Sequence, residues 1–229
     1  MSDTEKPERI AGKRRMSPLV MALVIAALVA LVVAALYVFS AAFGNRVAAT
    51  GETTTMAAVC SAPEPGTLND AAGGEVAAFV PAERAISVRE LSFLREDGST
   101  TTLADWQGRT VLLNLWATWC APCRREMPSL DALQNEMGGA DFEVVAVSLD
   151  LGTAEKPKQF YSDIGLQHLG FFHDPSLELL NALKRQSLAF GLPATVLIDE
   201  NGCVLGALNG PAEWASEDAK ALIRAGQTL

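Results

Sequence analysis

Residues that bind metals and residues that carry positive charge are both scarce in this sequence. Its 229 residues include two histidines and four cysteines, and Asp and Glu (27) outnumber Lys and Arg (18) for a formal net charge of -9. Nucleic-acid binding draws most of its affinity from basic groups that neutralise phosphates, so this acidic balance argues against it. His168 and His173 do not form a close ligand pair, and neither a metal site nor a cofactor is predicted.

One long stretch of the chain has no charged residue at all. Leu19–Phe39 is uncharged over 21 residues, enough for a helix to cross about 30 Å of hydrocarbon. Basic residues gather before it and only Arg46 follows closely, so the positive-inside rule places the N-terminus in the cytoplasm. We therefore predict a cytoplasmic tail over 1–18 and a single transmembrane anchor over 19–41. The alternative is a cleaved signal peptide, although its apolar core would be shorter, about 7–15 residues.

The remainder of the chain divides into a tether and one folded domain. Residues 42–75 are rich in Ala, Gly, Thr and Pro, which is typical of an extracytoplasmic tether that lets a domain reach its partners. Over 76–229, runs typical of buried strands alternate with helical patterns, which predicts an α/β domain. Turn signals that contain Gly98 and Gly202 predict two hairpins. Their expected strands are Ser87–Leu94 with Ser99–Leu103, and Ala194–Ile198 with Cys203–Leu208.

Two closely spaced cysteines, Cys120 and Cys123, mark the candidate functional site. Thr110–Leu115 is a nearly continuous apolar run, typical of a strand buried on both faces. Apolar residues then recur at helical spacing, at Met127, Leu130, Leu133 and Met137. Cys120 is therefore expected at or near a helix N-cap, with Pro122 early in the helix, where a missing N–H costs nothing. The helix dipole favours an anion there, so we predict a redox dithiol with Cys120 as the nucleophilic thiolate.

The same pair of cysteines has three other interpretations. A zinc site needs a second pair of ligands, but Cys60 and Cys203 lie far apart in the sequence. A c-type haem attachment site needs His after the second cysteine, and Arg at position 124 excludes it. A purely structural disulfide is disfavoured, because so short a loop at an exposed helix start removes little chain entropy.

The stretch around the two cysteines resembles a known family. Leu112–Leu130, LLNLWATWCAPCRREMPSL, is similar to the TlpA/ResA/CcmG branch of membrane-anchored thiol–disulfide proteins in the thioredoxin superfamily. Three further stretches sharpen this to the TlpA type, and they are Gly191–Thr195 (GLPAT), Asn201–Cys203 (NGC) and Gly210–Ala219 (GPAEWASEDA). The resemblance covers roughly residues 60–225. It implies a thioredoxin fold, which is a central mixed sheet flanked by helices, with an added N-terminal hairpin.

The resemblance also implies roles for residues around the dithiol. Cys120 attacks a substrate disulfide, and Cys123, one helical turn further on and less exposed, resolves the mixed disulfide. Pro193 is expected to be a cis-proline facing the cysteines, with the backbone of Leu192 turned outward to pair with an extended substrate segment. The alternative for Pro193 is an ordinary trans proline in a loop. The other substrate-facing residues are expected to be Trp119, Ala121 and Pro122.

Glu126 is expected to take part in proton transfer. It shares a helix face with Cys123, and in the ResA-like branch a Glu at this spacing lies in the active site, where it accepts the proton of the second cysteine. The alternative is an exposed carboxylate that the helix dipole favours. Thioredoxin has a buried Asp where this chain has Asn114, which cannot titrate, so any proton acceptor must lie elsewhere.

The two remaining cysteines are expected to pair with each other. Unpaired cysteines are uncommon outside the cytoplasm, and the chain has an even number. The resemblance supports a structural disulfide between Cys60 and Cys203 that joins the tether to the last hairpin. A second redox pair is the alternative.

The implied function is that of an extracytoplasmic thiol–disulfide oxidoreductase acting mainly as a reductase. The expected location is a bacterial inner membrane, with the catalytic domain facing the periplasm. The expected substrates are disulfide-bearing proteins, either the copper-site subunit of cytochrome oxidase or its copper chaperone, because copper binds only reduced cysteines. The expected electron donor is a membrane thiol carrier.

Three alternatives to this function stay open. The first is a reductant for the haem-attachment cysteines of apocytochrome c. The second is a disulfide-forming oxidant, which typically has a His between its cysteines, whereas this chain has Ala121 and Pro122. The third is a module that holds copper or a partner through Cys120 and Cys123 without turnover.

Overall fold

The computed structural model describes residues 27–34, 36, 60–63 and 65–229. Its contacts divide the chain into two units, Met1–Glu52 and Thr53–Leu229. Residues 27–34 and 36 of the first unit are helical. Among the residues described, no helix is long and apolar enough to cross a membrane. The predicted tail, most of the predicted anchor and the first part of the predicted tether lie outside the described residues.

The second unit is built around strand β4 (Thr110–Trp116), whose seven residues are all buried. It pairs in parallel with β5 (Phe142–Ser148) and antiparallel with β7 (Ala194–Ile198). A strand with partners on both sides and helices on both faces must be almost wholly apolar, which explains the continuous apolar run. The sheet is mixed and has eight strands in the order β1-β8-β7-β4-β5-β6-β2-β3. The other strands are β1 (Phe79–Pro81), β2 (Ser92–Arg95), β3 (Thr100–Thr102), β6 (Phe172–His173) and β8 (Val204–Asn209).

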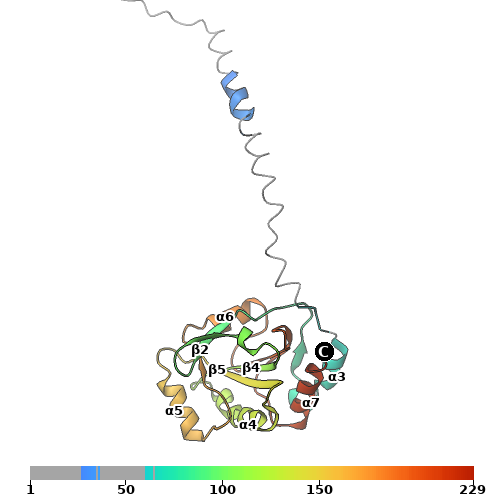
Figure 1. Ribbon diagram of the computed structural model, residues 1–229, viewed down its shortest axis with the longest axis vertical. Helices are drawn as coiled ribbons and strands as arrows, with labels where there is room; N and C mark the ends of the chain where they lie inside the picture. Colours follow the sequence, from blue (N-terminus) through green and yellow to red (C-terminus); the bar gives the residue numbers. More distant parts are fainter. Residues whose placement is uncertain (1–26, 35, 37–59, 64) are drawn as a thin grey trace, which may run out of the picture. The chain divides into compact units, whose positions relative to one another are not determined.

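Helices cover both faces of this sheet (Figure 1). The first face packs against α3 (Pro65–Ala71), α4 (Ala121–Met137), α5 (Glu155–Ile164) and α7 (Glu217–Gly226). The second face packs against α6 (Glu178–Arg185) and the 3-10 turn η2 (Leu103–Trp106). Alternate residues of β4 enter the two cores, so Leu112 belongs to the first and Leu113 to the second. The predicted α/β class with a central mixed sheet is confirmed.

Both predicted hairpins are present. In the N-terminal hairpin β2 pairs antiparallel with β3, and β2 also pairs with β6, so this hairpin extends the sheet at the edge opposite β1. Its strands are shorter than predicted, because Ser87–Leu91 leads into the hairpin without joining the ladder. Its turn contains Gly98 at a φ of 83°, a conformation that glycine adopts without steric cost. The closing hairpin joins β7 to β8.

The structure moves the boundary between tether and domain toward the N-terminus. Pro65–Ala71, predicted as tether, forms helix α3, which lies beside α7 and buries Leu68 completely (Figure 1). The 3-10 turn η1 (Gly74–Val76) follows, and the backbone N–H of Glu75 donates to Oδ2 of Asp218 on α7 at 3.1 Å. The folded domain therefore begins before residue 76. A seven-residue helix with one buried leucine leaves little periodic signal in a sequence rich in Ala and Gly.

Cys60 and Cys203 form a disulfide with an S–S distance of 1.99 Å. This is the pairing that the family resemblance implies. Cys203 immediately precedes β8, so the disulfide attaches the chain before α3 to the closing hairpin.

Candidate functional site

The two closely spaced cysteines lie where the buried central strand ends and a long helix begins. β4 ends at Trp116, Cys120 is the N-cap of α4, and Pro122 lies in the first turn of that helix. The backbone N–H of Cys123 donates to Sγ of Cys120 at 3.3 Å, and the two sulfurs form a disulfide. Cys120 is 5% exposed and Cys123 is completely buried. The predicted N-cap position is confirmed, and Cys120 is the sulfur nearer to solvent.

Asp150 holds the loop that leads from β4 to Cys120. It lies just past the end of β5, where its carboxylate accepts from the backbone N–H of Thr118 at 2.8 Å and from the Thr118 hydroxyl at 2.5 Å. The Ser148 hydroxyl donates to the same carboxylate at 3.0 Å. β4 and β5 are parallel, so their carboxyl ends meet at one edge of the sheet and bring these residues together. Sequence analysis missed Asp150, although a polar residue directly after a buried strand was a usable signal.

The residues predicted to face a substrate surround the disulfide at the surface. Trp119 is 64% exposed and immediately precedes Cys120, whereas Trp116 is fully buried. Ala121 is exposed and Pro122 is half-buried. These three residues therefore form an apolar part of the surface next to Cys120.

Pro193 lies opposite the end of β4. Ala194, the first residue of β7, pairs with Leu115, so Pro193 sits one position further along, level with the loop that carries the cysteines. The Leu192–Pro193 peptide bond is cis, the form that the resemblance implies. Pro193 is buried and Leu192 is half-buried. Strand pairing thus brings Pro193 level with the end of β4, four residues before Cys120.

Glu126 is buried, 3% exposed, one helical turn beyond Cys123. Its Oε1 accepts from the Asn114 side-chain amide at 2.9 Å. Its Oε2 accepts from the backbone N–H of Ala212 at 3.2 Å and from the indole Nε1–H of Trp214 at 3.3 Å. The alternative of an exposed helix carboxylate is therefore wrong.

Burial raises the pKa of Glu126 to about 7, and the hydrogen bonds from Asn114, Ala212 and Trp214 oppose part of that rise. Desolvation disfavours the charged carboxylate, whereas donors directed at it favour the charge. A group that titrates near neutral pH is well suited to exchange a proton, because neither of its protonation states is strongly preferred. Glu126 also follows the buried Cys123 by three residues on α4, which is the spacing on which its predicted role as a proton acceptor depends.

Sequence analysis assigned no role to the residues that hold Glu126. Asn114 was recognised as non-titrating, yet it donates to Glu126 and also to the Thr195 hydroxyl at 2.9 Å. Trp214 received no predicted role, but its indole N–H donates to the Glu126 carboxylate. The Ser129 hydroxyl holds Trp214 in turn, by accepting from its backbone N–H at 3.2 Å. Trp214 lies in Gly210–Ala219, one of the stretches that resemble the family, and this position was the signal that could have indicated a role for it.

We predict that Glu126 makes stability depend on pH. Between about pH 4.5, the ordinary glutamate value, and about pH 7, the folded protein keeps a proton that the unfolded chain has released. The free energy of unfolding should therefore fall by about 3 kcal/mol as the pH rises through this range. Urea unfolding of the oxidised protein at several pH values measures this loss.

Glu126→Gln should remove this loss of stability, because glutamine does not titrate. Glu178→Gln, which alters an exposed carboxylate on α6, is the matched control and should keep it. Parallel pH dependence in the wild-type protein and Glu126→Gln would show that Glu126 does not titrate in this range.

The described parts of the chain hold no group of three or more His, Cys, Asp or Glu side chains arranged for a metal ion. His173 is buried, with its Nε2 2.7 Å from the carbonyl oxygen of Asp150. The backbone N–H of His168 donates to Asp131 at 2.8 Å. His173 therefore supports Asp150, which holds the loop before Cys120, and His168 contacts Asp131 on α4.

The fold and the site place the chain among the thioredoxin-like proteins. Comparison with protein families makes this specific, since residues 48–223 match the Redoxin family, and the chain belongs to it.

Individual relatives agree with this family assignment. Thiol-disulfide oxidoreductase ResA of Oceanobacillus iheyensis is 40% identical over 106 residues, which are 46% of this chain and 52% of that protein. ResA of Halalkalibacterium halodurans is 30% identical over 141 residues, which are 58% of this chain and 74% of that protein. The chain thus spans about half the length of the first of these relatives.

A solved structure shows the same fold. The crystal structure of a thiol:disulfide interchange protein of the thioredoxin family from Chlorobium tepidum superposes with a TM-score of 0.52. The match covers 62% of this chain and 97% of that one, at 23% sequence identity.

Proposed function

We propose that this protein is a thiol–disulfide oxidoreductase that works mainly as a reductase through Cys120 and Cys123. One observation carries the proposal. The two cysteines form a disulfide at the start of α4, and the buried carboxyl group of Glu126 lies one turn behind them. The names of the ResA relatives agree with this activity.

The first step is attack on the substrate disulfide. In the reduced protein, the Cys120 thiolate attacks one sulfur of the substrate disulfide, whose S–S bond breaks and releases one substrate thiolate. A mixed disulfide between Cys120 and the substrate remains. The backbone N–H of Cys123, which points at the Cys120 sulfur at 3.3 Å, and the helix dipole stabilise the negative charge before attack.

The second step releases the substrate. The Cys123 thiol transfers its proton to the Glu126 carboxylate, and the resulting thiolate attacks the Cys120 sulfur. The mixed disulfide breaks, the second substrate thiolate leaves, and the Cys120–Cys123 disulfide forms. A dithiol donor then returns two electrons and two protons, which restores the reduced protein.

We further propose a location and substrates that extend the family resemblance. The domain faces the periplasm of a bacterial cell, held to the inner membrane by the uncharged Leu19–Phe39 stretch, and a membrane thiol carrier supplies its electrons. Its substrates are cysteines of a cytochrome oxidase copper-site subunit or of the copper chaperone. The exposed apolar Trp119 beside Cys120 supports a protein substrate, because it offers contact area next to the reacting sulfur.

The reduction potential of the Cys120–Cys123 pair tests the proposed direction. Equilibration of the full chain with glutathione or dithiothreitol, followed by the fluorescence of Trp119, measures that potential. We expect a value well below about -200 mV, in the range of reducing proteins. A value near about -120 mV would assign the protein to the disulfide-forming oxidants and exclude the reductase proposal.

A further inference from the structure

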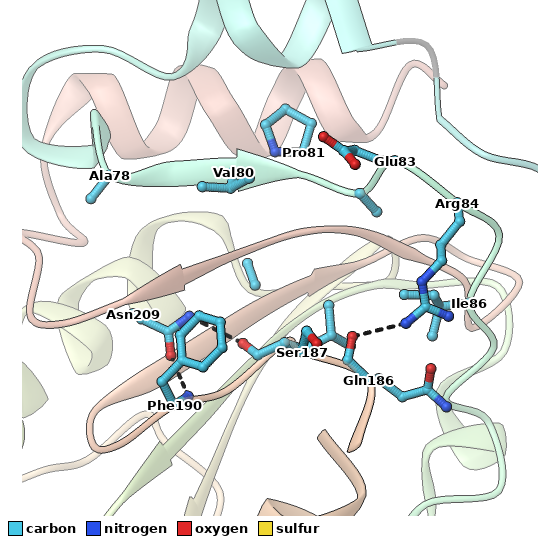
Figure 2. A pocket seen from close by; sticks show the side chains of 13 residues that line it. Ala78, Val80, Pro81, Glu83, Arg84, Ile86, Gln186, Ser187, Phe190 and Asn209 are labelled. Carbon is cyan, nitrogen blue, oxygen red and sulfur yellow. Dashed lines mark hydrogen bonds between the residues drawn. The ribbon is translucent and has the colours of Figure 1, made fainter. Parts of the chain in front are cut away.

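A groove lies at the β1 side of the sheet, between strand β1 and the segment 186–190 (Figure 2). Its volume is about 350 Å³, near the lower end of the range for ligand pockets and suited to one or two side chains of a peptide. Its floor consists of buried apolar residues, and they are Ala82, Ile86, Leu188 and Ala207. Val80 and Phe190 are exposed apolar residues that face the groove from its opposite walls. Val80 is 64% exposed and Phe190 is 72% exposed.

The lower wall of the groove is a rigid turn. Helix α6 ends at Arg185, and Ser187 follows at a φ of 61°, the left-handed conformation that closes many helices. The N–H of Ser187 donates to the Lys184 carbonyl at 3.0 Å, and the N–H of Leu188 donates to the Leu183 carbonyl at 2.9 Å. This pair of bonds is the Schellman motif, with the buried Leu183 and Leu188 as its apolar contact.

Side chains from the opposite wall hold this turn in place (Figure 2). The side-chain amide of Asn209, at the end of β8, donates to the Leu188 carbonyl at 3.2 Å and accepts from the Phe190 N–H at 2.8 Å. The Arg84 guanidinium donates to the Gln186 carbonyl at 3.0 Å. The groove is therefore preformed, and a ligand that enters it loses little affinity to ordering of the protein.

Strand pairing connects the groove to the dithiol. Asn209 pairs with Ala194, and Ala194 pairs with Leu115 of β4, so one end of the groove lies at the edge of the sheet where β4 leads to the cysteines. Phe190 precedes Pro193 by three residues in the same loop. A polypeptide whose cysteine reaches Cys120 can therefore continue along this edge into the groove.

The chemistry of the groove selects an apolar, uncharged side chain. Its floor is apolar, and its charged lining residues are one acid, Glu83, and one base, Arg84, so it has no net charge in a chain that is acidic overall. A charged group would lose hydration over this apolar floor, and the opposite charges of Glu83 and Arg84 give the groove no overall preference for either sign. An apolar group gains by leaving water.

We propose that this groove binds an apolar side chain of the protein substrate, close in sequence to the cysteine that Cys120 attacks. The inference rests on the proposed reductase function and adds a substrate preference to it. Phe190 and Val80 are the residues that determine this preference, because they project from the two walls and can close over the bound side chain.

Symmetric peptide disulfides test the preference. Two copies of one short peptide are joined through their single cysteines, so attack on either sulfur gives the same products. In one series Leu occupies successive positions on either side of the cysteine, and in the reference series Ser occupies the same positions. We expect the reduced full-length chain to react with the best Leu peptide about tenfold faster, in kcat/KM, than with its Ser counterpart.

Three variants assign the effect to the groove. Phe190→Ser and Val80→Ser should each remove most of the advantage of the Leu peptide. Ile164→Ser changes an exposed apolar residue at the end of α5, outside the groove, and should keep it. All three should reduce oxidised glutathione at the wild-type rate, because that small substrate does not reach the groove.

Each other result overturns the inference in a distinguishable way. If the wild type reduces Leu and Ser peptides equally fast, the groove does not select the substrate. The same conclusion follows if Phe190→Ser keeps the full advantage of the Leu peptide. Faster reduction of every peptide by Phe190→Ser would mean that Phe190 hinders access to the dithiol and does not bind the substrate. A dimer in sedimentation that Phe190→Ser separates would mean that a second copy does. If the wild-type protein does not reduce even oxidised glutathione, the proposed reductase function itself is wrong.

Discussion

Cys123→Ser is expected to stop turnover and to leave the substrate bound to Cys120. Without the second thiol, the mixed disulfide cannot be resolved within the protein, so turnover should fall by at least about a thousandfold. In the wild-type protein the buried Cys123 reaches the Cys120 sulfur from inside the domain. An external thiol can approach the mixed disulfide only from the solvent side, at Cys120. A gel without reductant should show a covalent adduct of the variant and its protein substrate, and dithiothreitol should release it.

Cys120→Ser is the matched comparison. This variant should lose turnover equally, but it should form no adduct, because the remaining Cys123 sulfur is completely buried. The two variants therefore separate the attacking cysteine from the resolving one. An adduct on Cys120→Ser, or sustained turnover by Cys123→Ser, would reverse or abolish the assigned roles.

Removal of the Cys60–Cys203 disulfide is expected to lower stability by about 5 kcal/mol. The bond joins residues 143 positions apart, and a cross-link that closes so long a loop removes much of the conformational entropy of the unfolded chain. The double variant Cys60→Ser/Cys203→Ser, compared with the wild type by urea unfolding under oxidising conditions, measures this loss. Many domains have a total stability of about 5–15 kcal/mol, so the variant should be close to unfolding at 37 °C.

The disulfide at the site provides the control for this experiment. Cys120 and Cys123 are three positions apart, and the same loop-entropy relation gives a loss of only about 2 kcal/mol when both become serine. Equal losses in the two double variants would show that loop closure does not set the stability of this domain. A large loss confined to Cys60→Ser/Cys203→Ser would establish that disulfide as the structural one.

Local patterns in the sequence were sufficient to predict the elements that carry the dithiol. The apolar run at Thr110–Leu115 marked β4, and the turn glycines Gly98 and Gly202 marked the hairpins. Helical spacing marked α4 even though Pro128 lies inside it, because the buried face of the helix outweighs the missing hydrogen bond. In each case the signal and the structure lie in the same short segment.

The surroundings of the site could not be derived from local patterns. Glu126 is held by Asn114, 12 positions before it, and by Ala212 and Trp214, 86 and 88 positions after it. Its pKa depends on burial that the whole fold creates. Spacing along α4 showed that Glu126 shares a face with Cys123, but spacing alone could not show whether that face is buried.

Short elements at the N-terminal edge of the domain were also beyond sequence reasoning. β1 has three residues and α3 has seven, so neither contains enough periods for a pattern to emerge. These elements exist because they pack against β8 and α7, which are more than a hundred residues distant. The groove beside Phe190 depends on β1 and could not be predicted for the same reason.

The disulfide at Cys203 determines where the chain before α3 is attached to the sheet. β8 begins next to Cys203 and ends at Asn209, beside Pro193 and the dithiol, so its six residues separate the two disulfides by about 20 Å along the sheet. The chain at Cys60 is therefore joined covalently to the start of β8 through the disulfide, in addition to its backbone continuation into α3. The dithiol and the covalent attachment of Cys60 therefore lie toward opposite ends of β8, so a pull on Cys60 would act on the end of the closing hairpin that is away from the reactive sulfur.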